Sequence, residues 1–92
     1  MGMPMRVRVQ FSGVVQGVGF RYTTVRMASA FKVTGTVRNL PNGGVELIAE
    51  GDETELRRFV DAAKRRMSGY IQGADEVWSE AEGKFTSFRI AY

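Results

Sequence analysis

The chain has 92 residues, 43% hydrophobic and 25% charged, which predicts one small domain with a single core over residues 1–92. The absence of cysteine and histidine excludes disulfides and thiolate chemistry, and it removes the commonest metal ligand and neutral-pH proton shuttle. The net charge is +3, and no apolar run approaches the roughly 20 residues of a membrane span, so we expect a soluble cytoplasmic protein that binds no membrane.

The charge is distributed unevenly along the chain. Residues 1–45 contain six basic residues and no acidic residue, whereas residues 46–92 contain ten acidic and seven basic residues. The first half should therefore present a positive field to an approaching anion.

The first predicted element is a strand over residues 5–11, where Met, Val, Val and Phe alternate with Arg, Arg and Gln. This period of two is typical of a strand with one buried and one exposed face. A glycine-rich loop follows and leads into a helix predicted from Phe20 to about Phe31. In that helix Phe20, Thr24, Ala28 and Phe31 share one face.

The middle of the chain predicts a hairpin and a second helix. Residues 33–39 and 45–50 have strand patterns on either side of the turn cluster Pro-Asn-Gly-Gly at 41–44. The helix should open near Asp52 and run to about Met67, because apolar residues recur there at helical spacing. Asp52 and Glu55 approximate a capping box at its start.

The C-terminal part is predicted to be a loop at 68–73 and two strands, at 75–80 and 85–92, around a turn at 82–84. The first six of these elements, in the order strand, helix, strand, strand, helix, strand, have the order of the split βαβ motif. We therefore expect an α+β, ferredoxin-like two-layer sandwich, in which two helices cover one face of an antiparallel sheet. In this interpretation Met27, Phe59, Met67 and Trp78 are packing residues.

The loop at residues 13–21, Gly-Val-Val-Gln-Gly-Val-Gly-Phe-Arg, has the design of a small-anion site. Glycines allow several backbone N–H groups to turn inward together, and the following helix adds unpaired N–H donors and the positive end of its dipole. Its first turn contains Arg21 and no acidic residue, whereas the second helix begins with acidic and ends with basic residues. This contrast indicates that a negative ligand belongs at Arg21; the alternative, from the same residues, is a glycine-rich turn followed by a surface arginine.

Other phosphate-binding motifs do not fit this loop. A Walker loop would end in Gly-Lys-Ser/Thr, and a dinucleotide fingerprint would need glycine where Tyr22 stands. The segment from Gly13 to Arg21 instead resembles the signature of the acylphosphatase family. A second signature of that family, with Gly, Val-Arg-Asn, a glycine turn and a hydrophobic strand ending in Gly, resembles Gly35 to Gly51 and places Asn39 in the asparagine position.

The resemblance implies hydrolysis of acyl phosphates to a carboxylate and inorganic phosphate, with neither metal nor cofactor. It implies that Arg21 binds the phosphoryl group and that Asn39 orients the attacking water. The rest of the site would be backbone N–H groups, those of Val14, Val15, Gln16, Gly17, Val18, Gly19 and Phe20. We expect a monomer whose partner is a small-molecule acyl phosphate, with inorganic phosphate or sulfate as competing anion.

The chemistry is consistent with these residue types. A carboxylate leaving group has a parent acid of pKa roughly 4, so it departs without a proton donor and histidine is not needed. A forked guanidinium and converging N–H donors can hold the three equatorial oxygens of the transferred phosphoryl group. The Asn39 carboxamide can aim a water, although it is too weak a base to take its proton.

One residue departs from the family pattern. Thr36 stands where an aromatic residue is usual after Gly35. In a regular strand Thr36 and Asn39 point to opposite faces. We therefore expect the phosphate site to be intact and the acyl-group preference to be the property in question.

Two alternative functions fit parts of the sequence. The same topology serves RNA-binding domains, but those stack bases on aromatic residues of the sheet, and the exposed positions of the first strand are Arg6, Arg8 and Gln10. We therefore expect no nucleic-acid partner. A non-catalytic anion sensor could also keep the loop, but Asn39 argues against it.

Overall fold

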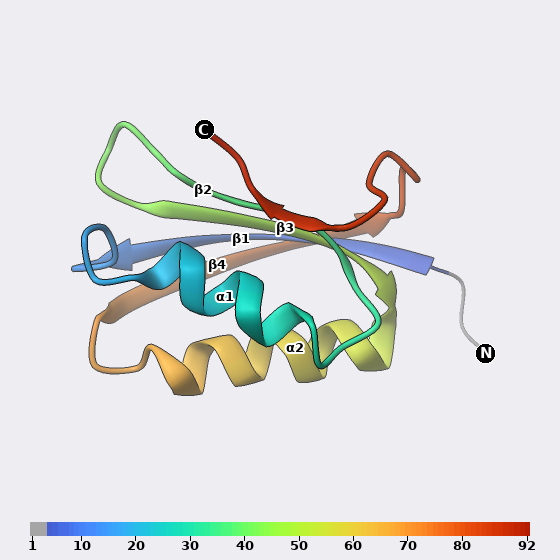
Figure 1. Cartoon of the computed structure of the whole chain (residues 1–92), viewed down its shortest axis with the longest axis horizontal. Coiled ribbons are helices and arrows are strands. Elements are labelled where there is room, and N and C mark those ends of the chain that lie inside the picture. Colours follow the sequence, from blue (N-terminus) through green and yellow to red (C-terminus); the bar gives the residue numbers. More distant parts are fainter. Residues whose placement is uncertain (1–3) are drawn as a thin grey trace.

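The computed structural model describes residues 4–92, which form a five-stranded sheet with both helices on one face (Figure 1). The elements are β1 (Pro4–Gly13), α1 (Phe20–Ala28), β2 (Thr34–Asn39), β3 (Val45–Asp52), α2 (Glu53–Arg66), β4 (Ile71–Glu80) and β5 (Phe88–Ile90). The strands lie in the order β4-β1-β3-β2-β5. The predicted ferredoxin-like sandwich is confirmed.

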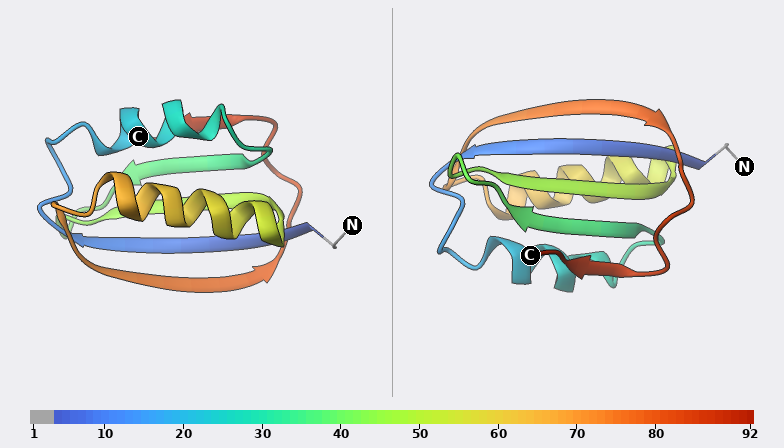
Figure 2. Two further views of the ribbon diagram at one scale, coloured as in Figure 1. Left: turned by 90° about the horizontal axis from the view of Figure 1, so that it is seen from below. Right: turned by 90° about the horizontal axis from the view of Figure 1, so that it is seen from above.

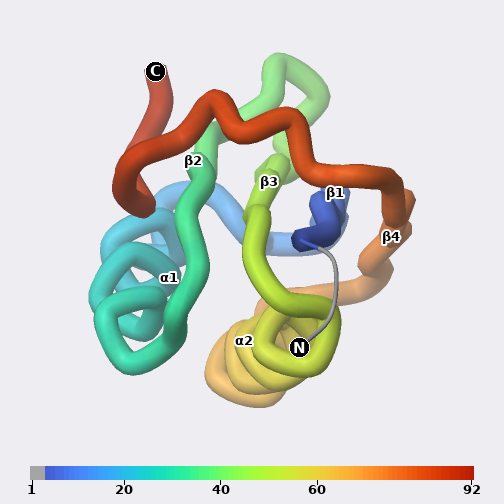
Figure 3. The backbone as a smooth tube through the Cα atoms, turned by 90° about the vertical axis from the view of Figure 1, so that its right-hand side faces the viewer, coloured from blue at the N-terminus to red at the C-terminus, as the bar shows by residue number. Residues whose placement is uncertain are grey.

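The two crossovers interleave the strands. Helix α1 carries the chain from β1 past β3 to β2, and α2 carries it from β3 past β1 to β4 (Figure 2). Viewed along the strands, α1 lies beneath β2 and α2 lies beneath β3 and β1 (Figure 3). The glycine loop between β1 and α1 therefore lies at the same end of the sheet as the β2–β3 turn.

The last strand differs from the prediction of a wholly antiparallel sheet. β5 pairs with β2 in parallel, with Gly35 opposite Phe88 and Val37 opposite Ile90, so the sheet is mixed. Residues 81–87 carry the chain from β4 at one edge, across the end of the sheet, to the other edge (Figure 2). After the crossing the chain turns back, so β5 runs antiparallel to β4. Because β2 also runs antiparallel to β4, β5 and β2 are parallel to each other.

The predicted buried faces are those of the core. Val7, Val9 and Phe11 of β1 are buried, as are the three residues Phe20, Thr24 and Ala28 of α1. The face of α2 that packs on the sheet is also buried, and consists of Leu56, Phe59, Val60, Ala63 and Met67. The rings of Phe11 and Phe20 lie 4.9 Å apart, so the loop that joins their elements is anchored in the core at both ends.

Three elements differ from the prediction by more than two residues, and one of them is β5, which spans only Phe88–Ile90 of the strand predicted at 85–92. The other two differences have a cause in hydrogen bonding. Helix α1 ends at Ala28 and not near Phe31, because the next three N–H groups bond three residues back and the Ser29 hydroxyl donates to the Arg26 carbonyl. Strand β4 begins at Ile71, inside the predicted loop, and pairs with β1 through an irregularity at Ser12 and Gly13. In both places hydrogen bonding overrides the local composition.

At the start of α2 the Asp52 side chain caps the helix as predicted, but Glu55 bonds elsewhere than in a capping box. The Asp52 side chain accepts the Thr54 backbone N–H at 3.2 Å. The Glu55 carboxylate accepts the Lys32 backbone N–H at 2.9 Å, which ties α2 to the connection between α1 and β2.

No helix within residues 4–92 is long and apolar enough to cross a bilayer.

A buried carboxylate on the open face of the sheet holds the crossing segment 81–87. Glu50 of β3 is 5% exposed and accepts the backbone N–H groups of Glu82 and Gly83, at 2.8 and 3.0 Å, and the Arg6 guanidinium at 3.0 Å. Burial raises the pKa of Glu50, but these hydrogen bonds and the charge of Arg6 outweigh burial and leave the pKa below its ordinary value. Ionised Glu50 therefore stabilises the segment that leads into β5.

We expect Glu50→Gln to lower the free energy of unfolding by about 1–3 kcal/mol at pH 7, because charge-assisted hydrogen bonds are lost. The folded-state pKa is depressed, so the contribution is present above the unfolded-state pKa and is lost as the pH falls through the folded-state value. Urea denaturation from pH 7 to pH 3 should show the gap to wild type narrowing. Glu80→Gln, at an exposed position, is the matched control, and a gap independent of pH would contradict the assignment.

Candidate active site

The glycine loop, the start of α1 and the end of β2 enclose a small pocket. Its volume is about 170 Å³, and its lining is Val15, Gly17, Gly19, Phe20, Arg21, Tyr22 and Asn39. The structure thus brings Arg21 and Asn39 together, although they are 18 positions apart in the sequence. The lining contains one cation and no carboxylate, so the pocket suits an anion.

The loop conformation depends on two glycines. Gly17 and Gly19 both have φ of +77°, and a Cβ at either would meet nothing within 4 Å. Glycine is therefore needed for its left-handed backbone and not for space. Gly19 is also the N-cap of α1 and has no side chain to accept the first N–H groups of the helix, so these donors are left for a ligand.

Arg21 stands in this uncapped first turn, which contains no acidic residue. Within residues 4–92 no carboxylate oxygen lies within 4.0 Å of its guanidinium, whose nearest described aromatic partner is the Tyr92 ring, 5.6 Å from the guanidinium carbon. Arg38, on β2 beside Asn39, does have an acidic partner, because it pairs with Glu46 at 2.8 Å on the open face of the sheet. Arg21 is thus a positive group with no acidic partner in the described chain.

Asn39 is the last residue of β2 and is exposed. In the part of the chain that the structure describes, its side chain makes no hydrogen bond, so its carboxamide can bind a water. Alternation along β2 puts Asn39 on the same side as the buried Val37 and puts Thr36 on the open face. Thr36 is therefore not part of the pocket.

One predicted cradle amide is engaged elsewhere. The Val14 N–H donates to the Tyr70 carbonyl at 2.9 Å, and this bond fastens the first residue of the loop to the chain before β4. A donor bound to a carbonyl is not available to a phosphate. The Val14 amide is therefore already bonded in the structure, and the amides of residues 15–20 remain the predicted phosphate-binding donors.

The sequence interpretation missed two side chains. Tyr22, to which it assigned no role, lines the pocket and is 70% exposed. Gln16, considered for its backbone alone, donates its side-chain amide to the carbonyls of Leu40 and Gly44, both at 2.8 Å. The signal in the sequence was a glutamine in the middle of the glycine loop. Its hydrogen-bond partners lie 24 and 28 positions away, so local patterns could not predict them.

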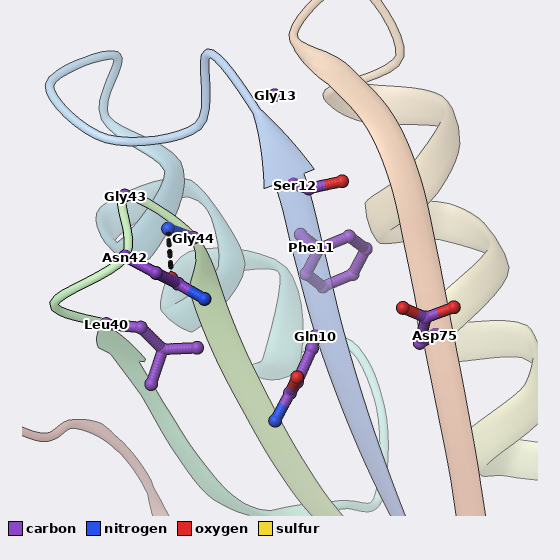
Figure 4. Close-up of a pocket in the computed structure, with 9 residues that line it drawn as sticks. All are labelled: Gln10, Phe11, Ser12, Gly13, Leu40, Asn42, Gly43, Gly44 and Asp75. Carbon is purple, nitrogen blue, oxygen red and sulfur yellow. Dashed lines mark hydrogen bonds between the residues drawn. The ribbon is translucent and has the colours of Figure 1, made fainter.

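A second hollow lies on the other side of the β2–β3 turn (Figure 4). It has a volume of about 210 Å³ and lies between that turn and the adjoining ends of β1 and β4, with Ser12, Asn42 and Asp75 among its lining residues. None of the predicted site residues lines it. In the turn, the Gly44 N–H donates to the Asn42 side-chain oxygen at 2.9 Å (Figure 4).

Comparison with known proteins agrees with this geometry. A sequence model of the family described as Acylphosphatase matches residues 7–90. An acylphosphatase of Paenarthrobacter aurescens is 42% identical over 87 residues, which are 94% of this chain and 93% of that protein. One of Caldivirga maquilingensis is 42% identical over an alignment of 94 positions, which covers 100% of this chain and 99% of that protein.

A solved structure is similar over the same length. The crystal structure of acylphosphatase from Bacillus subtilis superimposes with a TM-score of 0.86 at 33% identity, covering 96% of this chain and 99% of that one. The chain therefore belongs to the acylphosphatase family and is an enzyme of that kind.

Proposed function

We propose that the chain hydrolyses acyl phosphates by in-line attack of a water that Asn39 orients on a phosphoryl group held by Arg21 and the loop amides. The observation that supports this most is the meeting of Arg21 and Asn39 in one small pocket walled by the glycine loop. We further propose that the chain works as one monomeric domain in the cytoplasm, with inorganic phosphate or sulfate as competing anion.

The phosphoryl group is bound by three kinds of donor. The guanidinium of Arg21 offers a planar fork, the amides of residues 15–20 offer converging N–H groups, and the dipole of α1 adds positive potential at its first turn. Charge in the transition state lies on the equatorial oxygens of the transferred group, and we assign these donors to those oxygens. Donors fixed before the reaction stabilise that charge without reorganising.

Asn39 stands apart from the loop, at the end of β2. Its carboxamide oxygen accepts a hydrogen from water and leaves the water oxygen free to attack phosphorus. The new bond joins the water oxygen to phosphorus, and the bond from phosphorus to the acyl oxygen breaks. The carboxylate leaves with the electron pair, and the water proton passes to the phosphate or to that carboxylate.

The residues in the pocket supply no ligand set for a metal. Its lining has no carboxylate, thiolate or imidazole, and residues 4–92 contain no cluster of three or more such groups that could hold an ion. The charge of Arg21 and the amide donors are the groups present to balance the phosphate. We therefore propose a mechanism that runs without metal or cofactor.

The RNA-binding alternative has less support. The open face of the sheet presents Arg6, Arg8 and Gln10 from β1, but beside them β3 presents the carboxylates of Glu46 and Glu50. Ion pairs of Arg6 with Glu50 and of Arg38 with Glu46 take up two of the bases. A phosphate backbone laid on this face would meet carboxylates.

We expect the purified chain to release phosphate from benzoyl phosphate in the presence of EDTA, and Arg21→Lys to lower kcat/KM about 100-fold or more. Lysine keeps the charge but loses the forked geometry, and removal of one such donor costs this much in comparable sites. Arg26→Lys, at an exposed position in the last turn of α1, is the matched control. Near-normal activity of Arg21→Lys would remove Arg21 from its assigned role.

We expect Asn39→Ala to lower kcat about 100-fold while the inhibition constant of inorganic phosphate changes less than about threefold. The reason is that Asn39 is assigned to the water and not to the bound anion. Steady-state kinetics with phosphate as competitive inhibitor separates the two effects. A weakened affinity for phosphate that accounts for the whole loss would show that Asn39 binds the anion instead.

A further inference from the structure

We infer that Gln16 is a positioning residue: its side chain fixes the phosphate loop relative to the strand end that carries Asn39. The inference rests on the proposed function, because it assigns Gln16 to the same water-attack step. Gln16 does not line the pocket and is given no contact with the substrate. Its effect is transmitted through the β2–β3 turn.

The contacts of Gln16 join two elements that the chain does not join directly. Its side-chain nitrogen donates to the Leu40 carbonyl and to the Gly44 carbonyl, each at 2.8 Å. Leu40 directly follows Asn39 in the chain. One carboxamide thus connects the middle of the glycine loop to the residue next to the proposed water-orienting group.

The turn that receives these bonds is a closed unit. The Leu40 N–H donates to the Gly44 carbonyl at 2.8 Å, and the Gly43 N–H donates to the Leu40 carbonyl at 3.1 Å. Asn39 and Val45, on either side of it, are paired in the β2–β3 ladder. Because the turn is closed by these hydrogen bonds, a change in the position of the Leu40 and Gly44 carbonyls also changes the position of Asn39.

The loop has few other constraints on this side. Val14 is fastened to Tyr70 at one end, Phe20 is buried at the other, and the side chain of Val15 is in the core. Between them Gly17 and Gly19 give the backbone conformational freedom, and Val18 packs partly against the core. Among the side-chain hydrogen bonds of residues 4–92, those of Gln16 tie this stretch to the side of the pocket where Asn39 lies.

Glutamine suits the position because its amide carries two N–H hydrogens, one for each carbonyl. A carboxylate there would face two carbonyl oxygens with no hydrogen to donate. Methionine has a similar length and no donor. Gln16→Met therefore removes both bonds without adding charge beside the phosphate site.

The test is a double-mutant cycle of Gln16→Met and Asn39→Ala, with kcat for benzoyl phosphate and the inhibition constant of inorganic phosphate as readouts. We expect Gln16→Met alone to lower kcat about tenfold, since small misplacements of reacting groups cost this much or more. The phosphate inhibition constant should change less than about threefold. In the Asn39→Ala background, Gln16→Met should change kcat less than about twofold, because the group it positions is gone.

Gln10→Met is the matched control, since Gln10 is exposed on β1 and its side chain makes no hydrogen bond within residues 4–92 (Figure 4). It should leave kcat unchanged. Thermal melting of each variant without ligand verifies that it is folded at the assay temperature. If Gln16→Met melts too low, Gln16→Leu replaces it in the same cycle, because leucine also removes both N–H donors without adding charge.

The outcomes separate the two claims. Full activity of Asn39→Ala would overturn the proposed function itself and, with it, the role of Gln16. A low activity of Asn39→Ala combined with an undiminished tenfold effect of Gln16→Met in that background would overturn only the positioning role. An unchanged kcat in Gln16→Met would do the same.

Discussion

The candidate site depends on hydrogen-bond donors at the start of α1 for which no side chain within residues 4–92 is the acceptor. Gly19 begins α1 with a left-handed backbone and no capping side chain, and Arg21 in the same turn has no acidic partner within residues 4–92. A helix start of this kind is unfavourable unless an anion completes it. The second helix of the chain, which begins with Asp52, Glu53 and Glu55, shows the ordinary solution to the same problem.

The split βαβ topology explains why the loop and Asn39 meet. The loop follows β1 and Asn39 ends β2, and both lie at one end of the sheet with β3 between their strands. Helix α1 packs beneath β2, which brings its first turn under the strand end. The site is thus formed by backbone ends that the core holds in place, through pairs such as Phe11 with Phe20.

Local patterns in the sequence predicted what local physics decides. The alternation in residues 5–11, the buried face of each helix and the missing acid before Arg21 are properties of neighbouring residues, and the structure agrees with them. The parallel pairing of β5 with β2 could not be predicted in this way, because it depends on a segment crossing the whole sheet and held by Glu50. Periodicity carries no information on such a contact.

In the candidate site, too, some features could be predicted from the sequence, and others depend on tertiary contacts. Residue types and spacing pointed to Arg21, and the family resemblance pointed to Asn39 and supplied both roles. The hydrogen bond of the Val14 amide to Tyr70 and the reach of Gln16 to the β2–β3 turn are tertiary contacts. Each joins residues that are far apart in the sequence. Both hydrogen bonds depend on how the strands and loops are arranged in space, which the sequence patterns do not give.

The most direct test of the central claim is an amide NMR titration of the isotopically labelled chain with inorganic phosphate. We predict saturable shifts concentrated in the backbone amides of residues 15–20 and in the side chain of Arg21, with the Val14 amide nearly unmoved because Tyr70 already accepts its hydrogen. Shifts that spare this loop, or that gather instead on the basic groove of Arg26 and Arg66 between the helices, would contradict the account.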